Sequence, residues 1–114
     1  MRFNEQEALC SKYGVRPSVV RADAMLGIAR DFDATNFPIN GLRHPPQGDA
    51  CGWYLWTGTE LSQEPDFFVP MHASHLVHEC PAAIKYLGLP AGWRFLFGPR
   101  QEDVWNDPSL LDVS

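Results

Sequence analysis

The sequence predicts a single α+β domain, with a small, mostly antiparallel sheet covered by short helices. The 114 residues suffice for one domain, spanning 1–114. Ten prolines and nine glycines favour short elements joined by shaped loops over a helical bundle. Residues 52–59 and 93–97 are rich in aromatic side chains, which are enriched in strands.

The N-terminal segment predicts two helices. Asn4 can cap a helix over residues 5–13, because Glu7 lies three residues later as a capping-box partner. A second helix is expected after Ser18, another possible cap. Apolar residues follow it at helical spacing, at Val20, Met25, Ile28 and Phe32. A strand over residues 18–21 is the alternative.

Residues 33–49 predict one long, ordered loop. Phe37-Pro38 and Asn40-Gly41 are dipeptides typical of turns and loops. Long loops without secondary structure are often functional. Neighbouring prolines hold Arg43 and His44 together, so this loop can form a binding edge. The alternative is that it only closes over the core.

The rest of the chain predicts three strands. Residues 52–59 have aromatic side chains on both faces, which indicates a central strand or one with a helix on one side and a loop on the other. Residues 67–71 and 93–97 predict the other two strands. Residues 73–87 predict two helical turns that restart at Pro81. The first and last strands resemble each other together with their flanking glycines. This similarity indicates either a duplicated unit or chance likeness between aromatic strands.

The net charge of −5 is carried by residues 51–114, which hold eight acidic and three basic residues. Such a surface repels phosphate, so it argues against nucleic acid and anionic membranes and fits a basic protein partner. No 18-residue apolar run and no signal peptide is found. Cys10, Cys51 and Cys80 lack a CxxC spacing, which favours a reducing, cytoplasmic setting.

The candidate chemical groups do not form an enzyme signature. His72, His75 and His78, with Cys80 nearby, have the most metal-like spacing. On one helix, however, three imidazoles at this spacing drift around the axis and cannot easily converge on a zinc ion. No local motif supports a catalytic cysteine. We therefore expect no catalytic residues, no metal and no cofactor.

A binding pattern surrounds Trp105 near the C-terminus. Glu102, Asp103 and Asp107 flank this residue. An exposed tryptophan among carboxylates is typical of an interface with a basic protein. The alternative is that Trp105 packs into the core or anchors the tail. The candidate partner-binding residues are Arg43, His44, Glu102, Asp103, Trp105 and Asp107.

Several motifs together resemble the immunity family thirty-three of bacterial polymorphic toxin systems. Gly-Trp-Arg-Phe-Leu at 92–96, followed by the acidic turn 103–108, is the most specific of them. The others are at residues 41–46, 51–56, 65–68 and 80–90. The resemblance covers residues 38–112 and leaves the helical segment 1–35 unmatched. It implies an α+β protein without catalytic residues that neutralises a cognate toxin.

The predicted function is therefore that of an immunity-type protein that binds a toxin with a basic surface. One alternative is a regulatory module that binds a small molecule or a peptide through residues 43–46. A less favoured alternative is a metal-dependent enzyme that uses the three histidines. Reversing Glu102, Asp103 and Asp107 to lysine is expected to slow toxin association, weaken its salt dependence and leave the fold intact.

Overall fold

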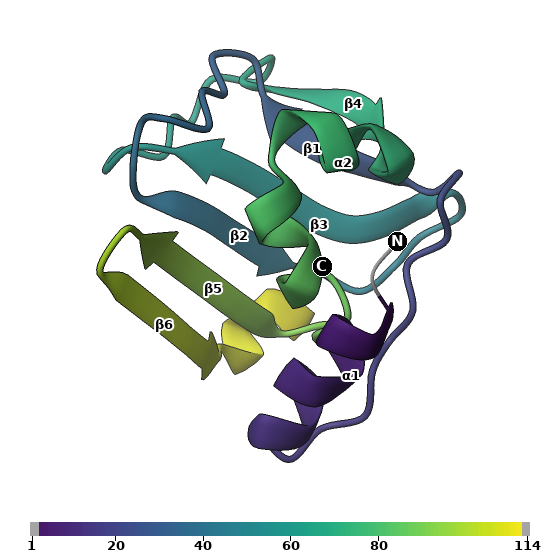
Figure 1. Cartoon of the computed structure of the whole chain (residues 1–114). Helices are drawn as coiled ribbons and strands as arrows, with labels where there is room; N and C mark the ends of the chain where they lie inside the picture. Colours follow the sequence, from purple (N-terminus) through teal and green to yellow (C-terminus); the bar gives the residue numbers. More distant parts are fainter. Residues whose placement is uncertain (1–2, 113–114) are drawn as a thin grey trace.

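The computed structural model describes residues 3–112 and shows one α+β domain built on a six-stranded sheet (Figure 1). The sheet has the strand order β4-β1-β3-β2-β5-β6, and only the β1–β3 pair is parallel. The strands are β1 (Met25–Ala29), β2 (Ile39–Arg43), β3 (Ala50–Thr57), β4 (Phe68–His72), β5 (Trp93–Gly98) and β6 (Gln101–Asn106). The helices are α1 (Phe3–Lys12), α2 (Leu76–Glu79) and the 3₁₀ turns η1 (Ala73–His75), η2 (Pro81–Tyr86) and η3 (Pro108–Leu111).

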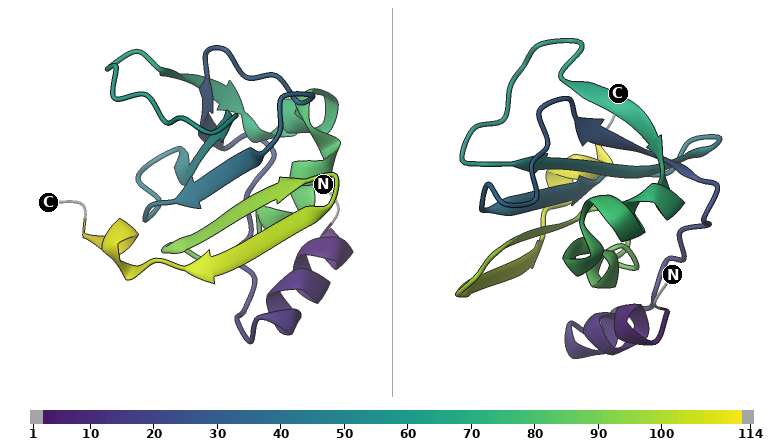
Figure 2. Two further views of the ribbon diagram at one scale, coloured as in Figure 1. Left: turned by 90° about the vertical axis from the view of Figure 1, so that its left-hand side faces the viewer. Right: turned by 45° about the horizontal axis from the view of Figure 1, so that its top comes forward.

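The main core lies between one face of the sheet and the helices α1, α2 and η2, which cover that face (Figures 1 and 2). Trp53, Leu55 and Phe95 point into this core and are at most 1% exposed. The opposite face, called the open face below, has only a small second core. There η3 places Leu110 against Leu42, Trp56 and Ala29.

The structure confirms the predicted fold class and several of its elements. Helix α1 matches the first predicted helix, but it begins at Phe3, so Asn4 lies inside the helix and the prediction that it caps the helix is wrong. Strands β3 and β5 match the two aromatic strands. Strand β4 and the turns between it and β5 also lie where the sequence predicts them. Strand β3 has strands on both sides, as its two-sided aromatic pattern indicated.

The predicted second helix after Ser18 is wrong, and so is the alternative strand over residues 18–21. Residues 15–21 have no regular secondary structure, and the strand that follows is β1. Strand β1 lies between β3 and β4, so both of its edges are hydrogen-bonded to neighbouring strands. Its five residues are too few for a clear period-two pattern, and the apolar residues of this segment matched helical spacing by coincidence.

The predicted loop over residues 33–49 contains β2 and is therefore also wrong as one unbroken loop. Asn40-Gly41, an expected turn, lies inside this strand. Gly41 leaves room for the Phe95 ring, whose nearest atom would be 2.2 Å from a Cβ at that position. The Asn40 amide donates to the carbonyls of Trp56 and Gly58 on β3 and just beyond it. Strand β6, which the sequence did not predict, extends the sheet on the far side of β5.

The two similar aromatic stretches occupy equivalent places on either side of β2. Gly41 pairs with Leu55 of β3 and also with Phe95 of β5. For each of residues 39–42 of β2, the partner on β3 and the partner on β5 are forty residues apart in the sequence. Gly52 and Gly92, which precede the two tryptophans, both have positive φ angles, of 95° and 93°. The sequence similarity therefore corresponds to two strands that meet the same central strand in the same register.

Candidate functional site

The candidate site lies on the open face where β5 and β6 form the margin of the sheet. Trp105 on β6 is 37% exposed, so it belongs to the surface and not to the core. Arg94 lies directly opposite it on β5, and the guanidinium carbon is 5.3 Å from the centroid of the indole. A cation over an aromatic face is attracted by the ring quadrupole. This contact orients a large, exposed aromatic side chain.

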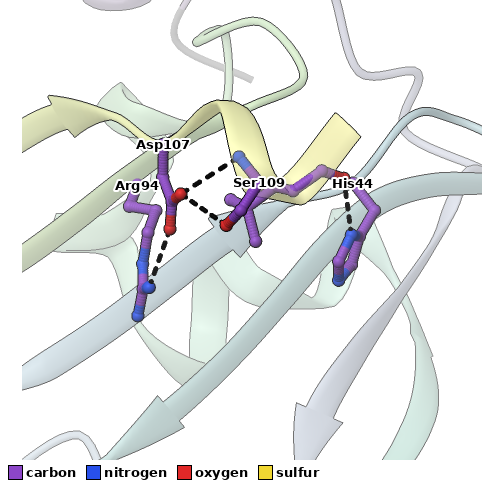
Figure 3. Close-up of polar contacts among 5 residues, drawn as sticks. His44, Arg94, Asp107 and Ser109 are labelled. Atoms are coloured by element: carbon purple, nitrogen blue, oxygen red, sulfur yellow. Dashed lines mark hydrogen bonds and ion pairs between the residues drawn. The ribbon is translucent and has the colours of Figure 1, made fainter. Parts of the chain in front are cut away.

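Asp107 connects Arg94 to the turn η3, as Figure 3 shows. Its carboxylate accepts hydrogen bonds from the backbone N–H and the hydroxyl of Ser109 and pairs with Arg94 at 3.2 Å. The Ser109 hydrogen bonds, supported by Arg94, hold the pKa of Asp107 below its usual range. Asp107 is thus the N-cap of η3 and at the same time the anion that holds Arg94.

His44 meets the same turn from β2. Its Nδ1 lies 3.0 Å from the carbonyl oxygen of Leu110, as Figure 3 also shows. Its ring packs edge-on against Tyr54, which in turn packs against Phe68. His44 is half-buried and serves as the link between η3 and a row of aromatic side chains on the open face.

Arg43, by contrast, is 2% exposed and lies within the core of the protein. Its guanidinium donates hydrogen bonds to the carbonyls of Cys51, Ser18, Leu87 and Leu89. It therefore joins three distant segments of the chain from inside. Its donors are directed into the protein, so we exclude Arg43 from the candidate surface.

Glu102 is separated from the other acids by strand alternation. Successive side chains of β6 point to opposite faces, so Glu102 points to the helix-covered side and Asp103 and Trp105 to the open face. There Glu102 accepts a hydrogen bond from the Tyr86 hydroxyl and pairs with Lys85 and Lys12 at 3.5 and 3.7 Å.

These contacts change the pKa values of both partners in opposite directions. The Tyr86 hydrogen bond, followed by the two lysines, lowers the pKa of Glu102. Burial, followed by the same hydrogen bond, raises the pKa of Tyr86. Glu102 therefore attaches β6 to η2 and is already neutralised by cations of the chain itself.

Asp103 is the acid that remains available to a partner. It is exposed, accepts a hydrogen bond from Gln101, and has no ion-pair partner in the described part of the chain. The expectation that all three acids can be reversed without harm to the fold does not fit these contacts. Glu102 and Asp107 both hold structural elements together, so only Asp103 allows a clean reversal.

Some residues of this surface were missed in the sequence. Arg94 was not among the predicted partner-binding residues, although the alternation of residues 93–97 places its side chain on the face opposite to that of Phe95. Leu111, which is 50% exposed, follows the buried Leu110 in η3. A cavity of about 240 Å³ also lies beside Gly27, where the Tyr54 ring crosses the strand. No sequence motif pointed to this cavity.

The three histidines do not form a metal site. His72 ends β4, His75 ends η1 and His78 belongs to α2. Only the first two rings meet, with centroids 5.6 Å apart. Within residues 3–112 there is no group of three or more His, Cys, Asp or Glu side chains that could hold a metal ion.

Comparison with known proteins adds one finding. The family model of the Imm33-like domain matches residues 5–107, and this range contains β1 to β6. The match begins at residue 5, whereas the motifs recognised in the sequence began at residue 38. No curated protein and no solved structure matches the chain. None of the helices within residues 3–112 has the length and apolar character needed to cross a membrane.

Proposed function

Because the chain belongs to the Imm33-like domain family, we propose that it is an immunity protein that binds and neutralises a cognate bacterial toxin. In this proposal it acts by occupying a surface of the toxin and performs no reaction itself. It works in the cytoplasm, where the toxin would act on the cell that carries both proteins. The buried, unbridged thiols of Cys10, Cys51 and Cys80 are compatible with that reducing compartment.

The observation that carries this proposal is the exposed Trp105 with Arg94 stacked on its ring. Tryptophan and arginine are the residues most enriched in interface hot spots. Here the two stand in register on neighbouring strands, and Asp107 fixes the arginine. A side chain that is already ordered loses less conformational entropy on binding, so more of its contact energy remains as affinity. Asp103 adds a negative charge that suits a basic toxin surface.

The proposal is tested by toxin neutralisation. The candidate toxin is the protein that stays bound to this chain in a pull-down from the source organism and is encoded beside its gene. We expect a bacterial host that expresses this toxin to stop growing, and co-expression of the present chain to restore growth. A purified, stoichiometric complex is the second expected result. Failure to restore growth, despite soluble expression of both proteins, would exclude the immunity function.

Two variants locate the surface. Trp105→Ala removes the exposed indole, and Phe3→Ala removes a similarly exposed ring from α1, far along the chain and with 43% exposure. We expect only the first variant to lose protection against the toxin. Equal protection by both variants would move the binding surface away from β5 and β6. A rise in melting temperature with a small molecule, in the absence of any toxin complex, would favour a ligand-binding module instead.

A further inference from the structure

The sheet has two edge strands, β4 and β6, which differ in their ability to accept another strand. The Arg30 N–H donates to the Phe67 carbonyl beyond the β1–β4 ladder. Hydrogen-bonded and non-hydrogen-bonded pairs alternate in an antiparallel ladder, and Pro70 lies three positions from this bond, opposite Gly27. Pro70 is therefore in a non-hydrogen-bonded pair, and its backbone N and C=O point away from β1, toward the open edge. Proline has no N–H to donate, and its ring occupies the middle of that edge. Strand β4 is therefore a closed edge.

The outer edge of β6 has no such obstacle. The Asp107 N–H donates to the Gly92 carbonyl at 2.6 Å, which shows which residue pairs of the β5–β6 ladder are hydrogen-bonded to each other and which are not. By the same alternation, the backbone N–H and C=O groups of Glu102, Val104 and Asn106 point away from β5. Figure 2 shows β6 at the margin of the sheet, with no further strand beside it. Five of its six residues are exposed.

The charges along β6 decide which strand can occupy this edge. Exposed edge strands are hazards for self-association, and charged side chains are a common protection. A second copy of this chain, with a net charge of −5, would bring its own Asp103 to the contact, and the like charges would repel. A cationic strand would be attracted to Asp103 on the open face. On the covered face it would meet Lys12 and Lys85 around Glu102, so its cations belong on the open face only.

We propose that β6 is the docking edge of the protein and that the partner adds a strand to it, with basic side chains on the open face beside Asp103 and Trp105. This inference rests on the proposed immunity function for the identity of the partner, a basic toxin. Backbone hydrogen bonds would supply affinity in this recognition mode, and the side chains on the open face would supply specificity.

The first test uses the isolated protein and a synthetic probe, a short capped peptide that alternates lysine and valine. The matched control alternates glutamate and valine. Amide hydrogen exchange followed by NMR should show the N–H groups of Glu102, Val104 and Asn106 protected by about tenfold with the lysine peptide and unchanged with the glutamate peptide. No protection of these three groups, or protection along β4 instead, would overturn the proposal. Concentration-dependent dimerisation that protects them without peptide would also overturn it, because a second copy would be the occupant.

The second test uses two variants at one position. Val104→Pro deletes an outward N–H, which an edge strand tolerates, and Val104→Ala shortens the same side chain but keeps that N–H. We expect the proline variant to lose peptide protection and the alanine variant to keep it. With the toxin in hand, the proline variant should bind at least about tenfold more weakly than the alanine variant. Equal toxin binding would refute strand addition and leave the immunity function standing, whereas peptide addition without any toxin neutralisation would refute the immunity function alone. If Val104→Pro does not fold, the exchange pattern of the unmodified protein decides.

Discussion

The guanidinium of Arg94 lies over the indole of Trp105, with 5.3 Å between the guanidinium carbon and the ring centroid. The two residues are direct cross-strand neighbours on β5 and β6. Asp107, at the end of β6, holds the other side of the same guanidinium. An exposed tryptophan is thereby oriented by an arginine that is itself held by an ion pair. This arrangement makes Trp105 the centre of the proposed interface, and its neighbours determine how it can be tested.

Replacing Trp105 with alanine should weaken toxin binding strongly and change stability little. Truncation of a hot-spot tryptophan costs about 2 kcal/mol or more, which corresponds to about a thirtyfold loss of affinity. The indole is on the surface, so the free energy of unfolding should change by about 1 kcal/mol at most. Calorimetric titration with the toxin and urea denaturation measure the two effects. A loss of stability as large as the loss of binding energy would assign Trp105 to the fold.

Replacing Asp103 with lysine should slow association without changing the fold. Asp103 has no ion pair within the described residues, so its reversal breaks none. At low salt we expect the association rate constant for a basic toxin to fall by about threefold, and the difference to disappear at high salt. Stopped-flow measurements at several ionic strengths check this result. The control is Asp23→Lys, which reverses an exposed acid in the turn before β1. An equal effect of both reversals would indicate net charge alone.

The elements that the sequence predicted correctly are those whose local signals agree with their surroundings. Helix α1 has its buried residues at helical spacing, at Gln6, Leu9 and Cys10, and β3 and β5 are rich in aromatic residues. Strand β2 contains the turn-like dipeptide Asn40-Gly41 because both residues make specific contacts with the neighbouring strands β3 and β5. Gly41 accommodates the Phe95 ring, and the Asn40 amide reaches carbonyls of β3 and the turn after it. Such reasons lie in residues far away in the chain, so local patterns cannot show them.

The candidate site was predicted in part for the same reason. Trp105 and its flanking acids were visible as a cluster in the sequence, and their order along the chain was clear. Because β6 had not been predicted, it was not expected that successive side chains there point to opposite faces of the sheet. This alternation separates Glu102 from Asp103 and Trp105. Glu102 turned to the covered face and met Tyr86, while Arg43, expected at a binding edge, became a buried donor. Only the tertiary structure shows which charges the chain already uses for itself.

The Glu102–Tyr86 contact predicts a dependence of stability on acidic pH. The folded state lowers the pKa of Glu102, so its contribution is complete above the ordinary glutamate pKa. It is lost as the pH falls through the lowered value, because protonation weakens the bonds to Tyr86 and the lysines. Glu102→Gln should cost about 1 kcal/mol at neutral pH, a modest figure because the side chain is 31% exposed.

The difference between Glu102→Gln and the unmodified protein should therefore shrink below the ordinary glutamate pKa. Urea denaturation at a series of pH values measures it. Asp33 and Asp107 also have lowered pKa values and contribute to the same acid limb in both proteins, so they cancel in the comparison. A difference that stays constant down to strongly acidic pH would show that the ionised carboxylate is not the stabilising form.

Replacing Arg43 with methionine should destabilise the fold more than any surface change considered above. Burial lowers the pKa of Arg43, yet a guanidinium stays charged at neutral pH, and this one has carbonyl acceptors from three segments. Methionine fills a similar volume but leaves these buried carbonyls unsatisfied, at about 1–3 kcal/mol for each one that water cannot reach. We expect a total loss of about 3–5 kcal/mol in urea denaturation, a large part of the stability of a domain of this size.

Two control variants separate the geometry of Arg43 from its charge. Arg43→Lys keeps the charge, but a single ammonium cannot reach both the acceptor of Nε and the acceptors of Nη1, so it should recover less than half of the loss. Arg21→Met removes an exposed arginine whose one ion-pair partner among residues 3–112 is the exposed Asp23, and it should change the unfolding free energy by less than about 0.5 kcal/mol. Full recovery by lysine would mean that the charge, and not the fork of donors, joins residue 18 and the end of η2 to the sheet. In that case toxin binding should also survive the lysine variant unchanged, since the open face carries none of these contacts.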